Sequence, residues 1–389
     1  MVTKLYPPSH YSIYLGRALI QALPKNMKIR FYTNMTEKNM PFNCTEPVWQ
    51  ENPLYPFQLF RRALIEKPDI SHVQHETSMF GGWITAAAFP MLLILLRLAG
   101  SKIVVTVHAT PAVRLINSRF ARAFGFPAAL SPLLRASMVL LYVSITALSS
   151  RIIVHSKYCK DVLVRDYGGK SKSIDVIPIG VGKVHQAPSS RLGYWKDRIG
   201  NRRVILFFGY LGERKGVEYL VDAFRFVRDK HDRLLLVIAG GMLPYTHRYL
   251  SHLKSLIHGL GLDNNVLLFS ITPMPLGDLH ALYSLAEIVV LPYTYSISAS
   301  LALSYAFEHK KPVVVTNTGV FPDEVQQGKN GLLVRPRDAV ALATAIDTLI
   351  SDRRLRHNMS RHIKHATACQ SWDESAHKTI EVYCKTLRK

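Results

Sequence analysis

Two neighbouring cations, Arg214 and Lys215, are the residues whose type and setting point most directly to chemistry. They lie in a short loop that Gly209 and Gly212 allow to turn sharply, between a continuous apolar run and a segment with apolar residues at helical spacing. A strand–loop–helix unit of this kind adds oriented N–H groups and a positive dipole end to the two charges. The pattern predicts a phosphate-binding site, with a solvated Arg–Lys pair on a surface turn as the alternative.

The loop 293–300, with the sequence YTYSISAS, is a second candidate because it precedes an apolar helix. Ser298 or Ser300 would be a good N-cap for that helix. The exposed amides at its start would then bind a second face of the same phosphate. A capped helix without any ligand is the alternative interpretation.

Two further residues stand at the ends of predicted strands. His108 ends the run VVTVH, where a histidine serves either as a structural residue or as a ligand contact, and His75 with Glu76 is a weaker case. In the segment 313–334, Pro322 and Asp323 open a short predicted helix between two strands. Asp323 is either a plain first-turn acid or part of a site.

The order of elements indicates the fold class. Short apolar strands alternate with helices, which predicts an α/β protein with parallel sheets covered on both faces. The strands are predicted at 28–33, 69–74, 103–108, 151–155, 175–178, 204–208, 234–239, 266–269, 287–292 and 312–316, and helices at 217–228, 245–258, 277–284 and 300–308.

Ligands of doubly wound sheets bind beyond the carboxyl ends of the strands. His108, the loop 209–215, Gly240 with Gly241, and the serines at 298 and 300 all follow predicted strands. We therefore expect them to converge on one cleft between two domains. The polar stretch 180–201, rich in Gly, Pro and Ser, is the predicted break between these domains.

The charge of the chain, +22, is unevenly distributed. No Asp or Glu occurs in the 84 residues from 77 to 160, which hold nine Lys and Arg residues and the two apolar segments 83–98 and 130–148. This basic, apolar and acid-free region predicts a protein that lies on an anionic bilayer. The alternative is that both apolar segments are buried helices. We predict no spanning helix. Nucleic acid is not a predicted partner, since no recognised binding motif occurs.

The four cysteines are far apart in the sequence and match no metal or redox spacing, which suits a reducing compartment. They are Cys44, Cys159, Cys369 and Cys384.

The order of these motifs resembles glycosyltransferase family 4. The resemblance is strong from about residue 150 to 350 and rests on HSKYCKDVL, DVIPIGV, FFGYLGERKGVEYLVDAF, LLLVIAGG, IVVLPY and KPVVVTNTGVFPDEVQQGKNGLLV. It implies the GT-B fold, two Rossmann-like doubly wound domains facing across a cleft. Residues 1–183 would form the acceptor and membrane-facing domain together with a crossover helix at 370–389. Residues 184–369 would form the nucleotide-sugar donor domain.

The resemblance also implies roles for single residues. Lys215 matches the lysine that contacts the donor diphosphate, whereas the arginine that precedes it in the family falls on Tyr210, and Arg214 would replace that charge. The paired glutamates of the family fall on Ile297 and Tyr305. The remaining implied donor contacts are Gly209, Gly212, Gly240, Gly241, Ser298, Ser300, Leu301 and Asp323.

The N-terminus departs from the family pattern. The sequence Pro7-Pro8-Ser9-His10-Tyr11 stands where the family has a strand and a Gly-Gly loop. We expect either a different acceptor loop or an upstream start, with a first strand that is short or missing.

The predicted activity is transfer of a sugar from a nucleotide-sugar donor to a lipid-linked, polysaccharide or other glycan acceptor, with retention of configuration. Lys215 and Arg214 would stabilise the leaving diphosphate, and His108 would contact the sugar or the acceptor. We expect no cofactor and no metal, and a peripheral location at the cytoplasmic face of the cell membrane. The alternative is a non-catalytic GT-B scaffold at the membrane, because both family glutamates are absent. An epimerase would be expected to need carboxylates as acid and base.

Overall fold

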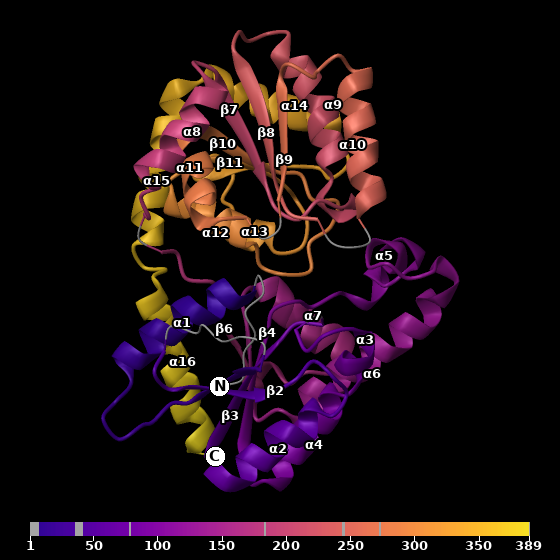
Figure 1. Ribbon diagram of the computed structural model, residues 1–389, viewed down its shortest axis with the longest axis vertical. Helices are drawn as coiled ribbons and strands as arrows, with labels where there is room; N and C mark the ends of the chain where they lie inside the picture. Colours follow the sequence, from indigo (N-terminus) through magenta and orange to yellow (C-terminus); the bar gives the residue numbers. More distant parts are fainter. Residues whose placement is uncertain are drawn as a thin grey trace.

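The computed structural model describes residues 8–35, 42–77, 79–182, 184–242, 246–271 and 274–388. Two halves lie one above the other, and each is a parallel sheet with helices on both faces (Figure 1). The central strands of both larger sheets are mostly buried and largely apolar, as expected for sheets that helices cover on both sides.

The N-terminal half contains a four-stranded sheet in the order β3-β4-β5-β6 and a separate parallel pair, β1-β2. Its strands are β1 (Phe31–Asn34), β2 (Thr45–Trp49), β3 (Ile70–His75), β4 (Lys102–Val107), β5 (Arg151–Val154) and β6 (Ile174–Val176). Its helices are α1 (Pro8–Ala22), α2 (Tyr55–Glu66), α3 (Trp83–Ala87), α4 (Phe89–Leu98), η1 (Val113–Leu115), α5 (Ser118–Ala123), η2 (Ala128–Leu130), α6 (Ser131–Leu148), α7 (Lys157–Tyr167) and η3 (Ser171–Ser173).

The C-terminal half contains a six-stranded parallel sheet in the order β12-β11-β10-β7-β8-β9. Its strands are β7 (Arg203–Phe208), β8 (Leu234–Gly240), β9 (Val266–Ser270), β10 (Ala286–Leu291), β11 (Val313–Thr316) and β12 (Gly331–Val334). Its helices are α8 (Ser189–Ile199), η4 (Glu213–Lys215), α9 (Val217–Arg228), α10 (His247–Gly259), α11 (Leu276–Leu285), α12 (Leu301–Glu308), α13 (Phe321–Glu324), α14 (Ala339–Ser351) and α15 (Arg353–Thr367).

The strand order of the second sheet contains a topological switch. The chain builds outward from β7 through β8 to β9, and then returns to the other side of β7 to add β10, β11 and β12. The crossovers after β7 and after β10 therefore leave the sheet in opposite directions. Such a switch leaves a crevice at the carboxyl ends of the two central strands, where doubly wound sheets bind ligands.

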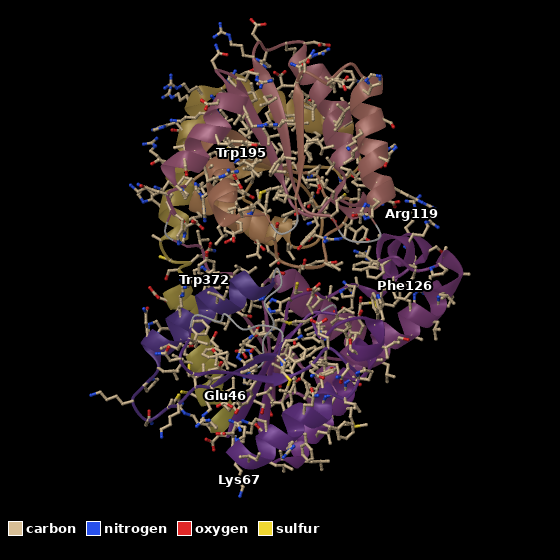
Figure 2. All side chains as sticks on the ribbon, viewed as in Figure 1. Glu46, Lys67, Arg119, Phe126, Trp195 and Trp372 are labelled. Atoms are coloured by element: carbon tan, nitrogen blue, oxygen red, sulfur yellow. The ribbon has the colours of Figure 1, made fainter. Side chains whose placement is uncertain are left out.

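The last helix, α16 (Trp372–Leu387), returns to the N-terminal half and packs along α1 and against β4. Its first residue lies where the two halves meet (Figure 2). The Trp372 ring stacks on Tyr14 at 5.4 Å between centroids and meets Tyr11 edge-on at the same separation. Gly180 lies directly beneath this ring, since a Cβ on Gly180 would lie 2.6 Å from it. The start of α16 thus packs tightly against the segment that joins the two halves.

Most predicted strands and helices occur within one to three residues of their expected bounds, but the beginning of the chain differs. The strand expected at 28–33 is Phe31–Asn34, and its partner Thr45–Trp49 was not predicted, because Pro47 interrupts that run. The described chain opens with α1. Residues 8–11, which stand where the family has its Gly-Gly loop, belong to this helix, and the expected change at the first strand falls on residues 1–7, outside the described residues.

The two apolar segments of the acid-free region are helices that lie against the first sheet. The segment 83–98 forms α3 and α4, which pack beside α6. By length and composition the helical stretch Ala128–Leu148 is able to cross a membrane, whereas the sequence had predicted no such helix. The side of α6 that faces α4 and α7 is buried, and its other side is exposed.

Candidate functional site

The loop between β7 and α9 carries the two predicted cations on one short 3-10 turn, η4. Gly216 ends this turn with φ +63°, and a Cβ there would lie 2.2 Å from the carbonyl oxygen of Pro292. The loop therefore packs directly against the end of β10, and the amide of Thr294 donates to the carbonyl of Arg214 at 2.9 Å. The crossovers from β7 and β10 meet at the switch point of the sheet.

Lys215 is half-buried in this loop, with its Nζ 3.7 Å from the centroid of the Tyr293 ring. Burial, and then the charge of Arg214, hold the pKa of Lys215 well below its usual value. The Arg214 guanidinium lies 5.8 Å from the same ring, and its buried Nη1 has no hydrogen-bond partner among the described residues.

No carboxylate within the described ranges forms an ion pair with either cation. Two adjacent, half-buried cations without a counter-charge are unfavourable unless an anion binds them. The arrangement is therefore suited to a ligand with concentrated negative charge, such as a diphosphate.

The N-terminus of α12 lies beside the Tyr293 hydroxyl. Ser300 caps this helix by accepting from the amide of Leu303 at 3.3 Å, and the Tyr293 hydroxyl lies 3.4 Å from the Ser300 Oγ. Leu301 is the first residue of α12, so the positive end of the helix lies beside the two cations. Of the two serines considered as caps, Ser300 has this role.

The predicted glycines shape the floor of the same loop. A Cβ on Gly240 would lie 1.8 Å from the carbonyl oxygen of Gly209, so the ends of β7 and β8 approach closely only because residue 240 has no side chain. The amide of Leu211 donates to the carbonyl of Gly241 at 2.9 Å. The carbonyl of Gly212 accepts from the amide of Lys215 at 2.8 Å.

Tyr210 lies in this loop, between Gly209 and Leu211, and its side chain is half-buried.

Ser298 and Asp323 lie nearer to the N-terminal half than the cations do. Ser298 forms an isolated antiparallel bridge with Ala109, and the amide of Thr110 donates to the carbonyl of Ile297 at 2.6 Å. The Asp323 carboxylate accepts from the amide of Tyr158, in the first turn of α7, at 2.7 Å. Both predicted donor residues thus also join the two halves, which the sequence did not predict.

His108 lies at the end of β4 within a chain of buried polar groups. Its Nδ1 lies 3.1 Å from the Nε2 of His155, and its Nε2 lies 2.9 Å from the Gln74 side chain. The His155 Nδ1 donates to the carbonyl of Ile177 at 3.0 Å, so in the neutral ring its Nε2 accepts from His108. Burial lowers the pKa of His155 to about 4 and that of His108 well below its usual value.

Neutral His108 then has no proton on Nε2, so it is bonded at both ring nitrogens only when Gln74 turns its amide NH₂ toward Nε2. A ligand would contact the ring by its face or by replacing one of these partners. The chain continues through Gln74 to His72, whose Nδ1 lies 2.6 Å from the Tyr383 hydroxyl on α16. The sequence carries no signal for this chain of groups, because its members lie on or directly after β3, β4 and β5 and on α16.

The positions of the missing family glutamates are both buried. Ile297 lies in the loop before α12, and the Tyr305 ring packs near Tyr283 at 5.9 Å between centroids. Glu324 was not predicted as a site residue. Its carboxyl lies beside Asp323, and the buried Oε1 has no hydrogen-bond partner in the described part of the chain. Burial, and then the charge of Asp323, raise the pKa of Glu324 to about 8. The sequence could have indicated Glu324 because it follows Asp323 in a segment that comes directly after a predicted strand.

Comparison with known families gives two matches that together span most of the chain. Residues 18–182 match the family model described as Glycosyltransferase Family 4, and residues 195–366 match the one described as Glycosyl transferases group 1. Among relatives, the chain is 31% identical over 239 residues to a D-inositol 3-phosphate glycosyltransferase of Corynebacterium jeikeium, covering 60% of this chain and 56% of the relative. It is 29% identical over 200 residues to an uncharacterized glycosyltransferase of Methanocaldococcus jannaschii, covering 49% of each. The chain spans about half the length of the curated relatives it matches.

Solved structures are similar over almost the whole chain. The Anabaena protein HepE, solved with UDP, aligns at a TM-score of 0.75 with 16% identity, covering 99% of this chain and 98% of that one. Sucrose-phosphate synthase of Thermosynechococcus elongatus aligns at 0.76 with 19% identity, covering 99% and 95%. These similarities confirm the predicted GT-B fold, with two domains built on parallel sheets.

Proposed function

Since this chain belongs to glycosyltransferase family 4 and has the GT-B fold, we propose that it transfers a sugar from a nucleotide-diphosphate sugar to a glycan acceptor, with retention of configuration. The observation that carries this proposal is the pair of half-buried cations at the switch point of the second sheet, Arg214 and Lys215, for which the described residues supply no acidic partner. A donor diphosphate would supply the missing negative charge.

The proposed chemistry follows from where charge develops. As the bond between the sugar and the diphosphate breaks, negative charge accumulates on the leaving oxygens. Lys215 and Arg214 would stabilise that charge, together with the first amides of α12 beside Ser300 and Leu301. The Tyr293 ring holds the Lys215 ammonium by a cation–π contact. No group among these requires a metal ion at the diphosphate.

Uridine nucleotides are the first donors to test, because the structures of the Anabaena protein contain UDP and UDP-glucose. Sugar recognition would differ from that of relatives with paired glutamates, since Ile297 and Tyr305 carry no carboxylate. The loop 296–300, which bonds Ala109 and Thr110 in the N-terminal half, would take part in holding the sugar.

We propose a lipid-linked or polysaccharide acceptor on the N-terminal half. Large apolar side chains on α3, α4 and α6 are exposed, including Ile84, Leu98 and Leu140 at 77%, 71% and 66%. Arg119 lies on the projecting α5 corner (Figure 2), and Arg122 lies in the last turn of the same helix. An exposed apolar face with cations and no acids suits an anionic membrane surface.

A hollow of about 710 Å³ lies beside this surface, between η1, α5 and α6. It is lined by Ile116, Asn117, Ser118, Ser131, Pro132, Arg135, Ala136, Val139, Leu140 and Val143. The Arg135 side chain crosses it to donate to the carbonyl of Ile116 at 2.9 Å. Its mostly apolar walls and single cation would suit part of a lipid phosphate.

The donor site is tested by thermal shift of the wild type and of Lys215→Met with UDP, UDP-sugars and other nucleotide sugars. A ligand that binds only the folded protein raises the melting temperature. We expect a shift in the wild type that Lys215→Met loses and that the exposed control Lys329→Met keeps. Equal shifts in all three proteins would contradict the assignment of Lys215.

A non-catalytic scaffold is the second candidate, favoured by the absence of both family glutamates at Ile297 and Tyr305. It predicts donor binding without turnover. Release of free nucleotide diphosphate from a bound donor, with membrane extracts as the acceptor source, distinguishes the two. Turnover that disappears in Lys215→Met would exclude the scaffold.

A further inference from the structure

A second polar cluster lies away from the donor site, where the segment joining the two sheets crosses the C-terminal half. It combines His185 of that segment, His280 of α11 and Glu308 in the last turn of α12. One nitrogen from each histidine and one carboxylate oxygen all lie within 4.8 Å of one another. A fourth residue, His309, follows Glu308 and places its Nε2 3.0 Å from the His280 Nδ1.

The contacts converge on a single oxygen. The Glu308 Oε1 lies 3.0 Å from the His185 Nδ1 and 3.8 Å from the His280 Nδ1, and it also accepts from the backbone amide of His185 at 3.1 Å. Ligand atoms around a tetrahedral zinc ion, with bonds of about 2.0–2.1 Å, lie roughly 3.4 Å apart. The spacing in the cluster therefore needs only small side-chain movements to surround an ion.

The setting of Glu308 favours a cation. Its side chain is 5% exposed, and no Lys or Arg of the described residues forms an ion pair with it. A carboxylate in the last turn of a helix also faces the negative end of the helix dipole. A buried charge in this position is costly unless a positive charge compensates it. Two imidazoles and one carboxylate are the ligand types that zinc and similar divalent transition metals prefer.

We propose that His185, His280 and Glu308 bind a divalent transition-metal ion of the zinc class, with His309 as a supporting contact or a fourth ligand. The side chain of His185 is half exposed, which leaves a path for the ion and room for a water ligand. Nothing in this cluster is shared with Lys215 or Arg214, which lie at the other end of α12, roughly 12 Å away along the helix axis. The expectation that no metal takes part in sugar transfer refers to the donor site around Lys215 and does not apply to this cluster.

The position of the site indicates a structural role. The His185 ring lies 6.1 Å from that of Tyr14 on α1, and Tyr14 stacks on Trp372 at the start of α16. Gly182 also packs on the Glu308 carboxylate, because a Cβ there would lie 3.1 Å from its Oε2. A bound ion would thus fix the joining segment to α11 and α12 of the C-terminal half.

The test is a Zn²⁺ titration of the untagged, metal-stripped full chain in competition with a chromophoric chelator. A Cys369→Ser background removes the exposed thiol. The variants are His185→Ala and Glu308→Gln, and the matched control is His258→Ala, which removes an exposed histidine 3.2 Å from Asp263. Co²⁺ in place of Zn²⁺ reports tetrahedral geometry by its visible absorption.

We expect one saturable equivalent in the wild type and in the control, and affinity at least about 10-fold weaker in both variants, as loss of even a supporting contact produces. Zn²⁺ should also raise the melting temperature of the wild type but not that of His185→Ala. No saturable binding, or equal affinity in all four proteins, would overturn the proposal. His185→Ala alters a half-exposed segment, so it decides the question even if Glu308→Gln fails to fold.

Discussion

The two sides of the boundary between the halves both carry basic side chains that packing shields from water, yet these side chains respond to that shielding in different ways. On the C-terminal side, Arg214 and Lys215 lie near the Tyr293 ring, and no carboxylate of the described residues pairs with either of them. On the N-terminal side, His72, His108 and His155 become neutral and bond to one another through Gln74 or to the backbone. The C-terminal side therefore presents positive charge to a ligand, whereas the N-terminal side presents neutral side chains held in place by hydrogen bonds.

The charged side gives the largest expected effect. Replacing Lys215 by Met removes one of the groups proposed to stabilise the leaving diphosphate, so we expect kcat/KM for the donor to fall by about 100-fold or more. Steady-state assays with the donor that the thermal-shift screen identifies provide the measurement. A fall of less than about 3-fold, in a variant that melts like the wild type, would remove Lys215 from the proposed chemistry.

The neutral side predicts a loss of stability in acid. Burial lowers the pKa of His72 and His75 to about 3 and that of His155 to about 4, whereas each binds a proton near pH 6.5 when unfolded. These depressed values stabilise the fold above pH 6.5, and that stability is lost as pH falls toward 4. Between pH 7 and pH 5, each of these histidines should lower the free energy of unfolding by about 2 kcal/mol, because only the unfolded state binds the proton.

His75→Phe makes this prediction specific to one residue. His75 has no hydrogen-bond partner among the described residues, and its ring packs 4.4 Å from that of Phe89 between centroids. The variant therefore loses a titrating group and no hydrogen bond. Urea unfolding at pH 7 and pH 5 should show a shallower pH dependence than the wild type. An unchanged pH dependence would show that His75 titrates normally in the folded protein.

The charge of Lys215 should also be linked to nucleotide binding. Burial and Arg214 lower the pKa of Lys215 in the free protein, and a bound diphosphate would raise it again. Nucleotide binding should therefore take up protons, and affinity should fall as pH rises through the pKa of free Lys215. Calorimetry in buffers of different ionisation enthalpy measures this uptake. Lys215→Met should abolish it, and equal uptake in that variant would assign the proton to another group.

The smallest expected effect concerns the contact between the two sides. Asp323→Asn keeps the hydrogen bond from the Tyr158 amide but removes the negative charge that lies beside the N-terminus of α7. We expect the free energy of unfolding to fall by about 0.5–1 kcal/mol. We expect a slightly lower melting temperature in low salt and little difference in high salt. A large loss of donor affinity instead would show that Asp323 contacts the ligand directly.

The sequence alone identified the second half well. Continuous apolar runs separated by helical periodicity placed β7–β11 and α9–α12 within a few residues, because both local signals and burial agree there. The sequence also placed Arg214, Lys215 and Ser300 at strand ends, and topology then requires such ends to meet. The resemblance to the family rested on this same half.

Only the tertiary structure decided which groups lack partners and which find them across the boundary. Sequence spacing carries no signal for the chain from Tyr383 to His155, for the bond between Asp323 and Tyr158, or for the convergence of His185, His280 and Glu308. Each set comes from elements far apart along the chain. The burial that sets their charge is a property of the packed halves, and local sequence patterns do not encode it.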